Sequence, residues 1–163
     1  MASTDELNRA KIKSALALIG FLFISYGVAA ISSTFSPGVW YEGLIKPSWN
    51  PPSWLFGPVW TVLYGMIAVA AWRVWRVKDS QLALGMWALH LVPNLLWSYF
   101  FFSARRMDYA LVDISFLLVG IVATMGLFAQ RDRIAALLLL PYLAWVSFAT
   151  LLNWTLLRLN WQI

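Results

Sequence analysis

Polar and aromatic side chains recur on one face of a predicted helix near the middle of the chain. His90, Asn94, Trp97 and Phe101 are spaced i, i+4, i+7 and i+11, which places them on a single helical face. Aromatic rings on such a face can stack on a flat molecule, while an amide or imidazole meets its polar edge. The spacing is typical of a pocket wall for a planar, mostly apolar ligand, and equally of the core of a helix bundle.

Two other apolar segments carry stripes of the same kind. One stripe has a tryptophan and a tyrosine one turn apart, and the other combines aromatic rings with small and branched side chains. The residues are Trp60 and Tyr64 in the first, and Tyr142, Trp145, Ala149 and Leu152 in the second. We therefore expect three helices to share one aromatic pocket.

The chain offers no conventional catalytic constellation. It has no cysteine, which excludes disulfides, thiol chemistry and cysteine metal sites. No carboxylate pair, Ser/His/Asp set or metal-ligand cluster stands out. We predict no metal site and no required cofactor, and hydrolytic or metal catalysis is disfavoured.

Composition indicates that the elements positioning these side chains lie in a membrane. Of 163 residues, 61% are hydrophobic and only 12% are charged, against roughly 45–50% apolar residues in a soluble domain. The basic residues behind the net charge of +5 sit at the ends of apolar segments, where lipid headgroups lie. This location argues against nucleic-acid binding and for one membrane domain over residues 1–163.

Hydropathy predicts an all-α fold with five transmembrane helices. A helix needs about 20 apolar residues to cross the hydrocarbon core, and the candidate spans are 14–33, 58–77, 81–104, 107–129 and 134–157. The first is expected to be retained as a helix, because its apolar part is longer than that of a cleaved signal peptide. Short connections predict that spans two to five pack as antiparallel neighbours.

The distribution of Lys and Arg predicts a cytoplasmic N-terminus. Basic residues are more numerous on the amino-terminal side of the predicted membrane than on the other side. The first group is Arg9, Lys11, Lys13, Arg73, Arg76, Lys78, Arg131 and Arg133, and the second is Lys46, Arg105, Arg106 and Arg158.

The long connection at 34–57 differs from an ordinary loop. Its four prolines each fix a backbone angle and remove a donor, which disfavours a helix. It is also rich in aromatic rings, which are destabilised by exposure to water, and Trp40 and Trp49 are among them. We expect a rigid lid that caps the pocket, the alternative being a re-entrant loop that anchors the protein at the membrane interface.

Several ordered motifs resemble one known family. WYEGLIKPSWNPP, GPVWTVLY, NLLW with FFSARRM, ALVD, and PYLAWVSFATLLNW follow one another along the chain. Together they resemble the TspO/MBR family of translocator proteins and bacterial tryptophan-rich sensory proteins. The resemblance implies five transmembrane helices, a pocket capped by the first loop, and binding of protoporphyrin IX, haem-like tetrapyrroles, sterols and isoquinoline-type ligands.

The resemblance also implies which residues contact a ligand. Trp40, Trp60 and Trp145 match tryptophans associated with the pocket in relatives, and Ala149 matches a small residue that lines it. His90 is the only histidine, and a neutral imidazole can ligate haem iron. Relatives generally carry Gln at that position, so a hydrogen-bonding role inside the bundle is the alternative.

Asp113 lies within the fourth predicted span, where an ionised group needs a partner. We expect Arg105 or Arg106 to pair with it. Pro93 and Pro141 are expected to interrupt the third and fifth spans and to widen the interior.

Sterol binding and self-association are weaker expectations. Where animal relatives carry a cholesterol-recognition pattern, this chain has Leu152, Trp154 and Arg158, with Trp in place of Tyr. Relatives are often homodimers, and small residues on the second and third spans suit close contacts between protomers. These small residues are Gly65, Ala68, Ala71, Ala83 and Ala88.

The resemblance thus implies a receptor-like or sensor-like membrane protein that binds tetrapyrroles, with sterols as a second ligand class, and has a role in their transport or regulation. One alternative is a porphyrin-degrading enzyme that uses Trp60 and Trp145. Another is a tetrapyrrole or sterol transporter, although no inverted repeat is visible. The expected location is the bacterial inner membrane for a bacterial protein, and the outer mitochondrial membrane for animal relatives.

Overall fold

The computed structural model describes residues 3–35 and 37–161, and its regular elements there are all helical. In chain order they are α1 (Thr4–Ser33), α2 (Val39–Glu42), α3 (Ser53–Trp75), α4 (Gln81–Ser98), the π-helix η1 (Tyr99–Ser103), α5 (Met107–Ala129), α6 (Arg133–Leu138) and α7 (Leu140–Leu159). Ser36, in the predicted capping loop, lies outside the described residues.

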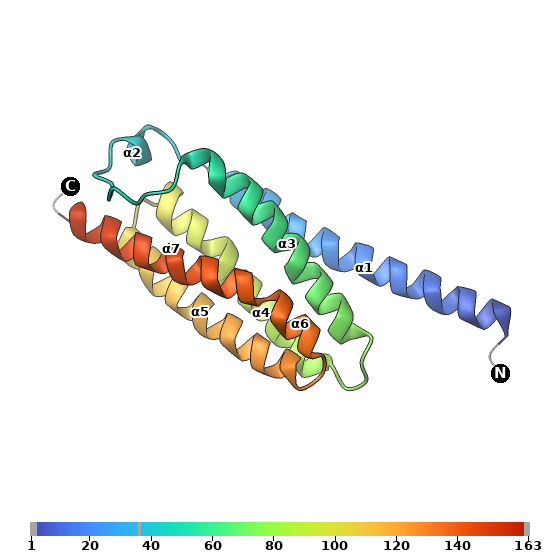
Figure 1. The fold of residues 1–163 in the computed structure, drawn as a ribbon. Helices are drawn as coiled ribbons and strands as arrows, with labels where there is room; N and C mark the ends of the chain where they lie inside the picture. The colour runs from blue at the N-terminus through green and yellow to red at the C-terminus, as the bar shows by residue number, and fades with distance from the viewer. Residues whose placement is uncertain (1–2, 36, 162–163) are drawn as a thin grey trace.

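The long helices form a bundle with α1 along one side (Figure 1). α4 packs mainly against α5, and α1 packs mainly against α3. The segment that carries α2 lies at the end of the bundle near the C-terminus, whereas the N-terminal part of α1 extends past the other end (Figure 1). A 30-residue helix is about 45 Å long, so α1 exceeds the roughly 30 Å of hydrocarbon.

Within the described residues, four stretches are long and apolar enough to cross a membrane, which makes this an integral membrane protein. They are Thr4–Ser33, Ser53–Trp75, Met107–Ala129 and Arg133–Leu159. The predicted span at 81–104 is not among them, because α4 carries polar residues that lower its apolar character. Two of those, His90 and Asn94, are buried inside the bundle rather than turned to lipid.

The helices that contain the first two predicted spans begin earlier than those spans. α1 begins at Thr4 rather than at residue 14, because Ser3 and Glu6 form a capping box at its start. α3 begins at Ser53 rather than at residue 58, with Pro52 at its N-cap and Pro58 inside the helix. A proline near the start of a helix removes little hydrogen bonding, so it did not mark the boundary.

The predicted bounds of the third to fifth spans agree more closely with the helices of the structure. α5 occupies 107–129 as predicted. The third span ends in the π-helix η1, and Pro93 is accommodated within α4. The fifth span is divided into α6 and α7 at Leu139, two residues before Pro141, as the proline led us to expect.

The connection at 34–57 contains the short helix α2 and the first residues of α3, although its prolines led us to disfavour a helix there. α2 forms because no proline lies between Pro37 and Pro47. The loop is tied to the end of α7 by Asn160: the backbone N–H of Ile45 donates to Asn160 Oδ1 at 2.9 Å, and Asn160 Nδ2 donates to the Ile45 carbonyl at 3.0 Å.

Small residues set the closest contacts between helices. A Cβ on Gly120 would lie 2.9 Å from His90 Cβ, where α5 meets α4, and a Cβ on Gly65 would lie 3.0 Å from Tyr26 Oη, where α3 meets α1. Ala68, Ala71 and Ala83, expected at contacts between protomers, are instead buried within the chain. That expectation is wrong for these three, because helices of one protomer already occupy the space beside them.

An ion pair joins α3 to the α5–α6 turn. Arg73 Nη2 lies 2.9 Å from Asp132 Oδ2, and Asp132 also caps α6 by accepting from the backbone N–H groups of Ile134 and Ala135. Partial burial opposes ionisation, but the hydrogen bonds from Ala135 and Arg73 prevail and hold the pKa of Asp132 below its usual value.

The first prediction concerns the contact between α4 and α5. Gly120→Ala should destabilise the protein by about 1–3 kcal/mol, because the added methyl overlaps the backbone side of His90. Gly126→Ala is the matched control on the same helix, since nothing lies within 4 Å of its added Cβ. Unfolding in detergent should show a lower stability for Gly120→Ala alone. Equal unfolding midpoints for the two variants would contradict the packing argument.

The second prediction concerns the pH dependence of the Arg73–Asp132 pair. Because the folded-state pKa of Asp132 is lowered, its stabilisation is present above the unfolded pKa near 3.9 and is lost as pH falls through the folded pKa. Asp132→Asn keeps a capping side chain, so it should cost about 0.2–1 kcal/mol at neutral pH. The difference from the parent protein should vanish on acidification, and a pH-independent difference would be inconsistent with the ion pair.

Candidate functional site

A cavity of about 600 Å³ is lined by residues of the helix bundle and of the segment that carries α2. Its wall is built by α1, the 34–57 connection with α2, α3, α4, η1 and α7. No residue of α5 or α6 lines it. The cavity is therefore lined by elements that are distant from one another in sequence.

Many of the predicted ligand-contacting residues lie on this wall. They come from three helices and from η1, as the aromatic stripes led us to expect. The residues that line the cavity are Trp60, Tyr64, Asn94, Trp97, Phe101, Ala149 and Leu152.

Other predicted residues lie behind the wall, in contact with residues that line it. Trp40 meets the ring of Phe101 at 6.0 Å between centroids, Tyr142 meets Trp60 at 6.1 Å, and Trp145 meets Phe56 at 5.7 Å.

Trp49 and His90 do not line the cavity. Trp49 packs on Phe148 at 5.8 Å between centroids, and Phe148 in turn packs on Trp145. His90 is buried, with its Nδ1 atom 3.3 Å from Thr124 Oγ1 and its ring 5.7 Å from that of Tyr142. This placement fits a hydrogen-bonding role inside the bundle, and His90 does not reach the cavity wall in this structure.

A three-residue hydrogen-bond network lies at the inner part of the wall. The Tyr64 hydroxyl donates to Asn94 Oδ1, and Asn94 Nδ2 donates to the Tyr142 hydroxyl at 2.6 Å. All three side chains are buried. The network joins α3, α4 and α7, because an amide in a membrane interior needs partners that lipid does not supply.

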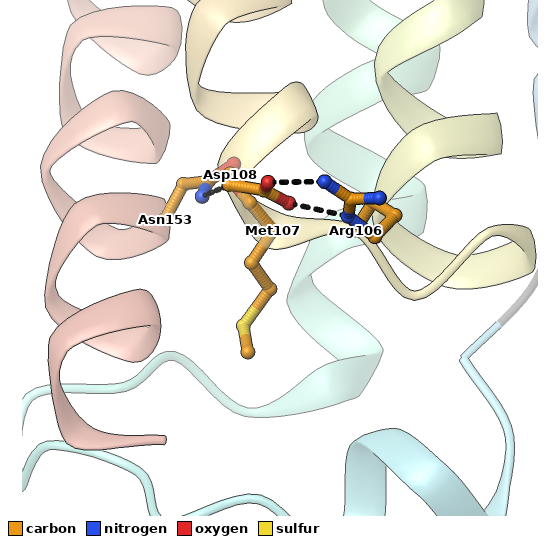
Figure 2. Close-up of polar contacts among 4 residues, drawn as sticks. All are labelled: Arg106, Met107, Asp108 and Asn153. Atoms are coloured by element: carbon orange, nitrogen blue, oxygen red, sulfur yellow. Dashed lines mark hydrogen bonds and ion pairs between the residues drawn. The ribbon is translucent and has the colours of Figure 1, made fainter. Parts of the chain in front are cut away.

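Asn153 makes a second set of bonds across the bundle. Its Oδ1 accepts from the Trp97 indole N–H at 3.0 Å, and its Nδ2 donates to the Met107 carbonyl at 2.9 Å. Figure 2 shows Asn153 reaching from α7 to the start of α5. Asn153 was not predicted as a site residue. An amide within the last apolar span could have indicated it, because such a group needs hydrogen-bond partners inside the bundle.

The π-helix continues the aromatic wall beyond α4. Trp97 stacks on Phe101 at 5.1 Å between centroids, and Phe101 and the adjacent Phe102 both line the cavity. π-helical turns are rare and are frequently found at functional sites. It places two successive phenylalanine rings beside the same space.

The sequence did not indicate that α1 forms part of the wall. Tyr26, Ala29, Ala30, Ser32 and Ser33 all line the cavity. The only polar signal was the occurrence of Ser and Tyr in an otherwise apolar span.

The expected pairing of Asp113 with Arg105 or Arg106 is wrong: among the described residues neither arginine forms an ion pair with it. Arg106 instead binds Asp108, with Nε and Nη2 donating at 2.9 and 2.6 Å to the two carboxylate oxygens (Figure 2). Arg106 pairs with Asp108 rather than with Asp113 because Asp108 lies only two residues away, in the first turn of α5, whereas Asp113 lies deeper in the helix. Within the described residues Asp113 Oδ2 has no hydrogen-bond partner.

The same part of the chain contains no group of three or more His, Cys, Asp or Glu side chains that could hold a metal ion.

Comparison with known proteins identifies what this chain is similar to. The TspO/MBR family matches residues 14–159. The tryptophan-rich protein TspO of Chlorobaculum tepidum is 45% identical over 150 residues, covering 89% of this chain and 95% of that protein. The tryptophan-rich sensory protein of Cereibacter sphaeroides is 40% identical, with 87% and 90% covered. The human translocator protein is 40% identical, with 74% and 75% covered.

The third prediction tests the bonds of Asn153. Asn153→Leu should lower stability by about 1–3 kcal/mol, because the partly buried Trp97 N–H loses its acceptor. Hydrogen exchange at that indole should also become faster. Ser147→Ala on the same helix removes only a bond to that helix's own Leu143 carbonyl, so it should change neither quantity. Unchanged exchange at Trp97 in Asn153→Leu would show that the Trp97–Asn153 bond is not formed.

Proposed function

The chain belongs to the TspO/MBR family, and on that premise we propose that it binds a tetrapyrrole, such as protoporphyrin IX or a haem-like molecule, in the cavity described above. Family membership supports a receptor-like or sensor-like role in the membrane, consistent with the name of the tryptophan-rich sensory protein among its relatives. The observation that carries the proposal is an aromatic cavity of about 600 Å³ inside a membrane bundle.

The size and walls of the cavity suit such a ligand. Ligand pockets commonly measure about 300–1,000 Å³. Trp60, Trp97 and Phe101 offer ring faces and edges for stacking on a flat macrocycle. A sterol is the second ligand class of the proposal, because its fused rings are also flat and apolar. The protein would then take part in the transport or regulation of these molecules.

We further propose that α4 with η1 is a fifth transmembrane helix. Its buried amide is satisfied inside the bundle, where Asn94 binds Tyr64 and Tyr142. A helix whose polar side chains face other helices crosses lipid although its mean hydropathy is low. We infer that residues 34–57 cap the cavity. Phe35, Pro37 and Tyr41 are among the lining residues, and Asn160 anchors the segment at Ile45.

The proposal also covers the oligomeric state of the protein and the membrane in which it lies. We expect a homodimer, which would have to form through surfaces other than the buried Ala68 and Ala71. We expect the inner membrane in a bacterium.

The fourth prediction tests ligand binding in the cavity. Protoporphyrin IX should quench tryptophan fluorescence saturably in purified protein. Ala149→Phe, which places a ring in the cavity, should weaken this binding by about tenfold or more, equivalent to about 1.4 kcal/mol. Ala144→Phe is the matched control, because Ala144 is exposed on the outer side of the same helix.

Equal binding by the parent protein and both variants would place the ligand outside the cavity and would refute the proposed site. Absence of saturable quenching in the parent protein would refute tetrapyrrole binding itself.

A further inference from the structure

The N-terminal part of α1 extends past the end of the bundle at which α3 ends (Figure 1). About 20 residues of helix cross the roughly 30 Å of hydrocarbon, and the apolar part of α1 at 14–33 supplies them. The residues from Thr4 to Lys13 are therefore left over at this end. They lie at the level of the lipid headgroups and beyond it.

A hydrogen bond between α1 and α3 marks the edge of the hydrocarbon. The indole N–H of Trp72 donates to the Ser14 carbonyl at 2.9 Å, and Ser14 Oγ lies 3.2 Å from the same nitrogen. Tryptophan is enriched at the membrane–water interface, where its ring contacts lipid and its N–H finds a polar partner. Trp72 is only partly buried, as such a position requires.

Two cations lie one helical turn beyond this contact. On α1, Lys11 lies three residues before Ser14. On α3, Arg76 lies four residues after Trp72. Because α1 and α3 run in opposite directions (Figure 1), both steps lead toward the same end of the bundle. A turn rises about 5.4 Å, which leads from the edge of the hydrocarbon into the layer of lipid phosphates.

The side chain of Arg76 is held in place but keeps its donors. Its Cζ atom lies 4.9 Å from the centroid of the Trp72 ring. Stacking on a ring leaves the N–H groups of a guanidinium free, because they point outward in its plane. Arg76 and Lys11 are exposed, and neither takes part in an ion pair among the described residues. A guanidinium that can bond two oxygens at once, with an ammonium at the same level, suits a phosphate group.

The surrounding charge also favours an anion. Eight cations and four carboxylates lie at this end, which leaves a net charge of +4. Two of the carboxylates are already bound, Asp132 by Arg73 and Glu6 by the backbone N–H of Ser3. The cations are Arg9, Lys11, Lys13, Arg73, Arg76, Lys78, Arg131 and Arg133, and the carboxylates are Asp5, Glu6, Asp79 and Asp132.

An apolar stripe leads from Arg76 into the membrane. Val69 and Val62 precede Arg76 by seven and fourteen residues, close to two and four turns, so the three share one side of α3. Val62 is 62% exposed, and Leu16 on α1 is 63% exposed. An acyl chain attached to a phosphate at Arg76 can therefore run along this side of the bundle. The apolar stripe favours a phospholipid over a free phosphate ion as the occupant.

We propose that Lys11 and Arg76, beside the Ser14–Trp72 contact, bind the phosphate of an anionic phospholipid. A lipid with a net negative charge is preferred to a zwitterionic one, because the ammonium group of the latter would meet the surplus of cations at this end. None of these four residues lines the cavity. The lipid site is thus separate from the proposed tetrapyrrole site, and it would fix the projecting part of α1 at the membrane surface.

The fifth prediction concerns the affinity of the full-length protein for lipids in dodecyl maltoside, measured by native mass spectrometry. Dioleoyl phosphatidylglycerol should bind saturably and at least about tenfold more tightly than dioleoyl phosphatidylcholine, which has the same acyl chains. Glycerol 3-phosphate offers the phosphate without the chains, and an oligoglutamate peptide offers negative charge without phosphate. Both should bind at least about tenfold more weakly than phosphatidylglycerol.

Two double variants test where the lipid binds. Lys11→Gln with Arg76→Gln should weaken phosphatidylglycerol binding by about tenfold or more. Arg131→Gln with Arg133→Gln removes the same charge from the α5–α6 turn at the same end, and it should keep the affinity within about threefold of the parent protein. All four side chains are exposed, so unfolding midpoints without added lipid should match that of the parent protein.

Each alternative has its own outcome. Equal phosphatidylglycerol affinity in the parent protein and the Lys11/Arg76 variant would overturn the proposed site. An equal loss in both double variants would show general attraction by net charge and would also overturn it. Binding of glycerol 3-phosphate or oligoglutamate as tight as that of phosphatidylglycerol would show a soluble phosphate or an acidic protein to be the occupant, against the proposal.

Discussion

Buried polar side chains in a membrane bundle need partners, because lipid supplies neither donors nor acceptors. Here Asn94 binds Tyr64 and Tyr142, and Asn153 binds Trp97 and the Met107 carbonyl. These bonds connect α3, α4, α5 and α7. Both amides also line the cavity, so the groups that hold the helices together are the polar groups that a ligand would meet.

Charge is kept away from the cavity wall. Arg73 pairs with Asp132 at the end of α3, and Arg106 pairs with Asp108 at the start of α5. Neutral amides, phenols and indoles line the cavity instead. This separation gives an apolar, aromatic space in which a ligand would meet rings and neutral hydrogen-bonding groups rather than a salt bridge.

Helical spacing predicted much of the cavity wall but not its limits. His90 and Asn94 share one face of α4, yet Asn94 lines the cavity while His90 packs against Thr124 and Gly120 on α5. Periodicity shows which residues share a face, and it does not show where a neighbouring helix covers that face. For the same reason Trp145 lies behind Phe56, and the contribution of α1 was not foreseen.

The sequence by itself determined the membrane class, the helical fold and the family, because apolar run length, proline placement and ordered motifs are local properties of the chain. Only the tertiary structure decided that Arg106 binds Asp108 rather than Asp113, that Asn153 joins α7 to Trp97 and Met107, and that α1 closes one side of the cavity. Partners and empty space depend on how separate helices are placed against one another, and no local pattern records that placement.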